Sequence, residues 1–164
     1  MFGSKKNKAL VASIVEATAP VVAMVQNRHG VPLGFWDDAY ALGFVMGRVN
    51  ALMGVHAEGL GVEDKGRVLV DALGALSGLK GKPLSETCMV LAAHQDADFL
   101  RASQNGMFIV MVEAGRVADD HPALAAARAA LSGEGTEPSP AATAERLLRD
   151  AWVAEIRDRL AIGA

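Results

Sequence analysis

Residues 34–57 read GFWDDAYALGFVMGRVNALMGVHA. At the roughly 100° per residue of an α-helix, Asp37 and Arg48 share one narrow polar edge of this stretch, and almost every other direction is apolar or small. A helix that is hydrophobic nearly all round is usually buried at the centre of a fold. The stretch therefore predicts a central apolar helix around which the rest of the chain packs.

The remainder of the chain also favours helices. Apolar positions recur at helical spacing, alanine and straight-chain residues dominate, and aromatic residues make up only 5% of the chain. The sequence therefore predicts an all-α fold, a compact bundle of about six or seven helices around residues 34–57. The further helices are expected from residue 4 or 8 to 26 and at residues 62–77, 85–104, 107–118, 122–132 and 140–162. Residues 107–112 also fit a buried strand, but no partner strand is visible elsewhere, so we expect a helix.

Local signals set the expected helix ends. Gly78 is expected in the left-handed conformation at a C-terminal cap, and Asn105-Gly106 is a turn signal. Pro20 removes one backbone hydrogen bond inside the first helix. We therefore expect either a kink at Pro20 or a break, with Thr18 capping a second short helix.

The stretch GEGTEPSP at residues 133–140 is the only linker-like segment. It divides the chain into a helical core domain (1–132), a linker (133–140) and a C-terminal helix (141–164). One apolar stripe of this last helix, at i+4 spacing, consists of Leu148, Trp152, Ile156 and Leu160. The stripe can pack on the core of its own chain or on that of a partner subunit.

Composition excludes several classes of protein. The chain has 164 residues, 51% of them hydrophobic, and a net charge of −3, so it can bury a core and is not expected to be disordered. With a pI of about 5.8, the chain lacks the excess of basic residues expected of a dedicated nucleic-acid binder. The longest runs without a charged residue, 17–27 and 102–112, are far shorter than the roughly 20 residues of a membrane span. The single cysteine, Cys88, fits a reducing cytoplasm.

Small and aromatic residues share one face of the central helix. Gly43 and Gly47 lie on it with Trp36 and Tyr40, and each glycine costs about 0.8–1 kcal/mol inside a helix. Close approach of another backbone offsets that cost. The approach is either an intramolecular crossing with the first or third helix, a subunit interface, or a groove for an apolar ligand. The candidates for an interface or for ligand binding are therefore five residues: Trp36, Tyr40, Gly43, Gly47 and, from the terminal stripe, Trp152.

Signals for catalysis or metal binding are weak. The four histidines, His29, His56, His94 and His121, fall in no metal-ligand motif. We therefore predict no metal site, no cofactor and no catalytic residue.

His94, Asp98 and Glu16 are the remaining side chains that suggest a functional role. His94 and Asp98 share a polar face with Thr87 and Arg101, an arrangement typical of a solvated helix surface. Glu16 lies one turn before Pro20 and is expected to be exposed or hydrogen-bonded across the bundle. Neither His94 nor Glu16 is taken as a site residue.

We predict a non-enzymatic interaction or assembly protein that forms a homodimer. The alternative is a carrier or sensor of a small apolar ligand or cofactor, because thioether side chains adapt to varied ligands. Its cavity would be lined by Met46, Met53, Met107, Phe108 and Met111. An enzyme is the third hypothesis, and it requires Glu16 or Glu113 to meet a histidine in a pocket.

Overall fold

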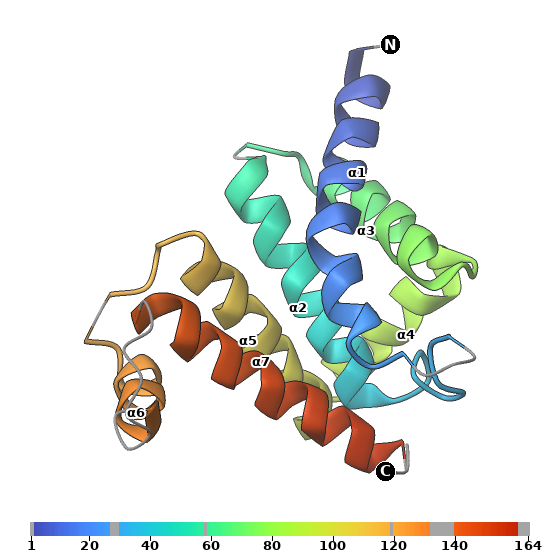
Figure 1. Cartoon of the computed structure of the whole chain (residues 1–164). Helices are drawn as coiled ribbons and strands as arrows, with labels where there is room; N and C mark the ends of the chain where they lie inside the picture. The colour runs from blue at the N-terminus through green and yellow to red at the C-terminus, as the bar shows by residue number, and fades with distance from the viewer. Residues whose placement is uncertain (1, 27–29, 58, 119, 132–139, 161–164) are drawn as a thin grey trace.

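The computed structural model describes residues 2–26, 30–57, 59–118, 120–131 and 140–160 (Figure 1). Within these ranges the chain forms seven helices and no strand. The helices are α1 (Phe2–Ala23), α2 (Ala39–His56), α3 (Val62–Ser77), α4 (Gly81–Ala93), α5 (Ala97–Glu113), α6 (Pro122–Leu131) and α7 (Pro140–Arg159). The predicted all-α bundle is confirmed.

The central position predicted for residues 34–57 belongs to α2. This helix contacts α1, α3, α4 and α5, and its buried residues point in every direction. It begins at Ala39 rather than near Gly34, because Gly34 has a φ of 85° and the residues after it form turns. Asp38 caps the helix by accepting a hydrogen bond from the Ala41 N–H at 2.8 Å.

Helix α5 is the main partner of α2, and glycines on both helices bring the backbones together. A Cβ atom on Gly43 would overlap the carbonyl of Phe99, and one on Gly47 would overlap that of Ser103. On the other helix, a Cβ on Gly106 would overlap the carbonyl of Phe44. The glycine face of α2 therefore packs within the chain, against α5. The prediction that its intramolecular partner is the first or third helix is wrong.

The predicted bounds of the helices 85–104 and 107–118 are wrong, although the helix expected in place of a strand at 107–112 is confirmed. The chain ends α4 at Ala93, begins α5 at Ala97 and continues it through Asn105-Gly106, where we expected a turn. Gln95 takes the left-handed conformation, with a φ of 53°. The Gln95 N–H donates to the Ala92 carbonyl at 3.1 Å and the Asp96 N–H to the Leu91 carbonyl at 3.0 Å, which closes a Schellman motif.

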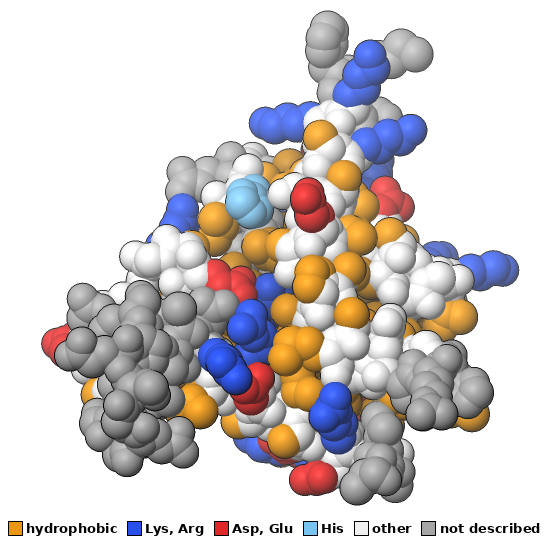
Figure 2. Space-filling view, in the orientation of Figure 1, with side chains coloured by type: hydrophobic (Ala, Val, Ile, Leu, Met, Phe, Trp, Pro, Cys, Tyr) orange, Lys and Arg blue, Asp and Glu red, His pale blue; other side chains and the backbone are white. Residues whose placement is uncertain are grey.

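The other helices of the core follow the prediction more closely. Helix α3 has its predicted bounds, and Gly78 caps it with a φ of 69°. Helix α1 continues through Pro20, so the predicted break is wrong and Thr18 is a buried residue inside the helix. The first turns of α1 project beyond the other helices, and exposed lysines surround this end (Figures 1 and 2).

Helix α7 packs on the core of its own chain, alongside α5 (Figure 1). Trp152 and Ile156 of the predicted stripe are buried, and the Trp152 ring stacks on Phe44. Helix α6 is attached through Leu124, which is buried against side chains such as Phe108. Residues 132–139, which include nearly all of the predicted linker, lie outside the described part of the chain.

None of the described helices combines the length and the apolar character that crossing a lipid bilayer requires.

Candidate functional site

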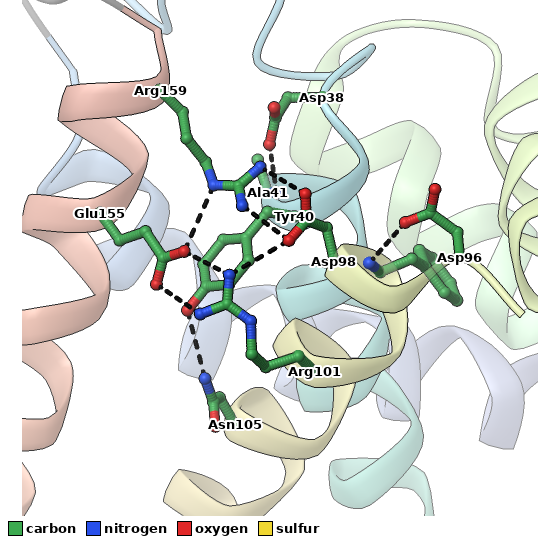
Figure 3. A network of polar contacts seen from close by, with 10 residues as sticks. Asp38, Tyr40, Ala41, Asp96, Asp98, Arg101, Asn105, Glu155 and Arg159 are labelled. Atoms are coloured by element: carbon green, nitrogen blue, oxygen red, sulfur yellow. Dashed lines mark hydrogen bonds and ion pairs between the residues drawn. The ribbon is translucent and has the colours of Figure 1, made fainter.

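A network of ion pairs joins α7 to α5 (Figure 3). Arg101 donates two hydrogen bonds to the Glu155 carboxylate, at 3.1 and 2.6 Å, and a third to Asp98 at 3.1 Å. Arg159 of α7 donates to Asp98 at 3.0 Å and to Glu155 at 3.3 Å. Bidentate guanidinium–carboxylate pairs fix orientation as well as distance. The network therefore sets how α7 lies against α5.

Tyr40 of α2 lies in the middle of this network. The guanidinium carbons of Arg101 and Arg159 lie 4.7 and 4.8 Å from its ring centroid, within the range of cation–π attraction. Its hydroxyl accepts a hydrogen bond from the Asn105 amide at 3.2 Å. Burial, together with the hydrogen bond to Glu155, raises the pKa of Tyr40 above 10.0, so the phenol stays neutral at physiological pH.

The two carboxyl groups of the network stay ionised. Burial opposes the ionisation of Glu155, but hydrogen bonds from Arg101 and Tyr40 outweigh it and lower its pKa below 4.5. Hydrogen bonds from Arg159 and Arg101 lower the pKa of Asp98 below 3.8. With both acids charged and both arginines paired, the network is an electrostatic clamp between α5 and α7.

A small hollow lies beside the clamp, between α5 and α7. Its volume is about 160 Å³, and we call it the α5/α7 hollow. Among its lining residues are Tyr40 from α2, Asn105, Phe108 and Ile109 from α5, and Trp152 and Glu155 from α7. The indole N–H of Trp152 is buried and has no hydrogen-bond partner in the described residues.

A larger, more open hollow, also lined by Phe108, lies between α5 and the segment that leads to α6. Its volume is about 330 Å³, and we call it the α5/α6 hollow. From α5 it is lined by Gln104, Met107, Phe108 and Met111, and from the following segment by residues 116–118 and His121. Positions 104, 107, 108 and 111 form one helical face, as spacings of three and four residues require.

The second wall of the α5/α6 hollow depends on how α5 ends. Gly115 adopts a left-handed φ of 64°. Its N–H donates to the Val112 carbonyl at 3.0 Å, and the Arg116 N–H donates to the Met111 carbonyl at 2.9 Å. This Schellman motif reverses the chain at the end of α5. Arg116 is therefore held beside Met111, and Val117 continues the wall.

The five residues predicted for an interface or a ligand separate into three places. Gly43 and Gly47 are buried between α2 and α5, where packing within the chain accounts for them. Tyr40 and Trp152 come together in the α5/α7 hollow. Trp36 is half-buried, makes an edge contact with the Phe35 ring at 4.8 Å and lines neither hollow.

The residues predicted to line a ligand cavity also separate. Met107, Phe108 and Met111 all line the α5/α6 hollow. Met53 is buried in the main core instead, and Met46 packs against that core. The three residues that stay together belong to one face of a single helix.

Arg48, predicted on a polar edge of the central helix, is almost completely buried. Only 1% of its side chain is exposed, and it pairs with Glu113 at 3.1 Å. It also donates to the Ala17 carbonyl of α1 at 3.1 Å. One arginine therefore links α1, α2 and α5, a role for which its place in the sequence offered no signal.

The residues of the predicted solvated face lie on two helices. His94 is exposed at the end of α4, and Thr87 donates to the Pro83 carbonyl of its own helix. Asp98 and Arg101 belong to the clamp, which we did not predict. The signal that could have revealed it was the pair Glu155 and Arg159, which lie one turn apart on the last helix.

Other candidate groups do not come together. Glu16 is exposed, as expected. Burial raises the pKa of Cys88 to about 12, which keeps the thiol protonated and supports its interpretation as a small core residue. His29 lies outside the described residues, and within them no group of three or more side chains could hold a metal ion.

Comparison with known proteins identifies no relative, because no family model, no curated protein and no solved structure matches the chain.

Proposed function

We propose that this protein is a carrier or sensor of a small apolar ligand, which binds in the α5/α6 hollow. The observation that supports the proposal is the shared lining of that hollow by Met107, Phe108 and Met111. Methionine side chains are flexible and polarisable, so they adapt to ligands of different shape. Concave apolar surfaces with a few polar groups are the usual form of small-molecule sites.

The hollow has room for a ligand of moderate size. An apolar cavity of about 150 Å³ holds one benzene molecule. By that comparison the 330 Å³ of the α5/α6 hollow accommodate about a dozen non-hydrogen atoms, such as an eight-carbon chain. Met107 is 45% exposed, so a ligand can reach the hollow without opening the core.

A pair of methionine variants tests the proposal. We expect 1-octanol, titrated by calorimetry, to bind the wild-type protein, and Met107→Glu to weaken binding by about ten-fold or more, because an ionised carboxylate replaces apolar contact area. Met89→Glu is the matched control, since Met89 is also an exposed helical methionine (57%) but lies on α4. The proposal fails if the wild-type protein does not bind 1-octanol, or if both variants bind it equally.

Native mass spectrometry of the purified protein provides an independent test. A carrier that retains its cargo shows extra mass that disappears on denaturation. That mass identifies the ligand directly.

A second candidate function is the assembly of a homodimer through α3 and α4. The observation in its favour is a groove of about 520 Å³ between these helices, whose lining includes the apolar side chains of Val70 and Met89. Its rim carries both signs of charge, on Glu63, Arg67, Asp71, Lys82 and Glu86. A two-fold contact joins the same patch of each subunit, so a rim of mixed sign can pair with its own copy. The neighbouring Val90 is 55% exposed and extends the apolar area.

For either function we propose a reducing compartment such as the cytoplasm, because Cys88 is buried and makes no disulfide.

A further inference from the structure

We infer that the ligand of the α5/α6 hollow is an apolar monocarboxylate, whose carboxylate is bound by Arg116 and His121. This inference rests on the proposed function and adds the chemical class of the ligand. The methionines and Phe108 contact the apolar part of the ligand.

The charges around the hollow support an anionic ligand group. Among the described residues, Arg116 and His121 are the ionisable ones that line it, and none of the described carboxylates does so. Arg116 is exposed and makes no ion pair in the described part of the chain. Glu113, the last residue of α5, is engaged by Arg48 at 3.1 Å. Asp120 precedes His121 in the chain but does not line the hollow.

Arg116 is suited to bind a carboxylate. The hydrogen bond from its N–H to the Met111 carbonyl fixes its backbone. The Arg116 side chain therefore begins next to the apolar residues that line the hollow. A guanidinium presents a planar fork of donors that matches the two oxygens of a carboxylate. A carboxylate bound here leaves the attached chain beside Met111 and Met107.

His121 offers a second donor. Its Nδ1 accepts a hydrogen bond from the Ala123 N–H at 3.3 Å, which places the proton of the neutral imidazole on Nε2. Nε2 is therefore a donor whether the ring is neutral or charged. The ring is tilted against Phe108, with centroids 4.8 Å apart, so it lies beside an apolar side chain that lines the hollow.

Two probes of equal chain length test the inference. Octanoate and 1-octanol share the apolar chain and differ in the end group, so their affinities for the wild-type protein isolate the contribution of the carboxylate. We expect octanoate to bind about five- to ten-fold more tightly than 1-octanol, as a charge-assisted contact at a partly exposed site implies. We expect Arg116→Gln to remove that preference and to leave 1-octanol affinity unchanged.

Further variants separate charge from geometry. Arg116→Lys keeps the charge without the planar fork and should restore part of the preference for octanoate. His121→Phe keeps a ring against Phe108 and should weaken octanoate binding but not 1-octanol binding. Arg67→Gln, at an exposed arginine of α3, is the matched control and should change neither affinity. Circular dichroism verifies that each variant is folded.

The outcomes distinguish this inference from the proposed function. If 1-octanol binds but octanoate binds no better, or if Arg116→Gln weakens both probes equally, the monocarboxylate class is wrong and an apolar site remains. If neither probe binds the wild-type protein, the proposed function fails as well.

Discussion

The crossing of α2 and α5 depends on residues without side chains. Gly43 and Gly47 on α2 and Gly106 on α5 allow the two backbones to approach so closely that a Cβ at any of these positions overlaps a carbonyl of the other helix. Backbone atoms cannot rotate away as a flexible side chain can. Each of these glycines is therefore required by the helix crossing.

We expect Gly47→Ala to lower the free energy of unfolding by about 1–3 kcal/mol, because the added methyl overpacks the α2–α5 contact. Gly66→Ala is the matched control. Gly66 is a helical glycine of α3 with open space around its Cβ position, and alanine there should stabilise by about 0.5–1 kcal/mol. Urea denaturation of both variants measures the two effects. Equal shifts of the same sign would contradict this account of the crossing.

Individual charged residues were the hardest to place from the sequence. On α2, Arg48 marks a polar edge on a helical projection, yet the folded chain buries it and pairs it with Glu113. Asp98 and Arg101 fit a solvated surface, yet they bind α7. A charge pattern within one helix shows which side chains share a face, but not which distant helix covers that face.

At the scale of the helices, the residue type at a helix end explains why the end of α3 was predicted correctly and the end of α4 was not. Helix α3 ends at Ser77 and is capped by Gly78, the residue type that most readily adopts a left-handed conformation, and its end was predicted. Helix α4 ends with the same conformation on Gln95, where no glycine signals it. Asp96, which caps α5 by accepting from the Phe99 N–H at 2.9 Å, was the available signal.

The left-handed Gln95 leads to a testable prediction. The left-handed conformation destabilises a non-glycine residue by about 1–2 kcal/mol. Gln95→Gly should therefore raise the free energy of unfolding by about 1 kcal/mol. Gln104→Gly, inside α5, should lower it by about 0.5–1 kcal/mol because helix interiors disfavour glycine. Thermal or urea denaturation checks both. A destabilised Gln95→Gly variant would show that the α4–α5 connection differs from the one described.

At the scale of the whole molecule, the proposed homodimer is tested by the same methionine variants with their roles exchanged. If α3 and α4 form the interface, the wild-type protein should show twice its chain mass in native mass spectrometry. Met89→Glu should then give monomers, because it introduces a charge into an apolar contact, and Met107→Glu should remain dimeric. A monomeric wild-type protein, or a dimer that Met89→Glu leaves intact, would exclude this interface.

Local chemistry in the sequence determined the fold class, the central position of α2 and the bounds of α3. Helical periodicity and caps act between residues only a few positions apart, so they can be interpreted from the chain itself. The tertiary structure alone decided that α5 covers the glycines of α2, that Asp98 and Arg101 pair with α7, and that three predicted cavity residues share one hollow while Met53 joins the core. These outcomes depend on contacts between helices far apart in the chain. Periodicity within a single helix fixes which residues share a face, but it does not specify the partner of that face.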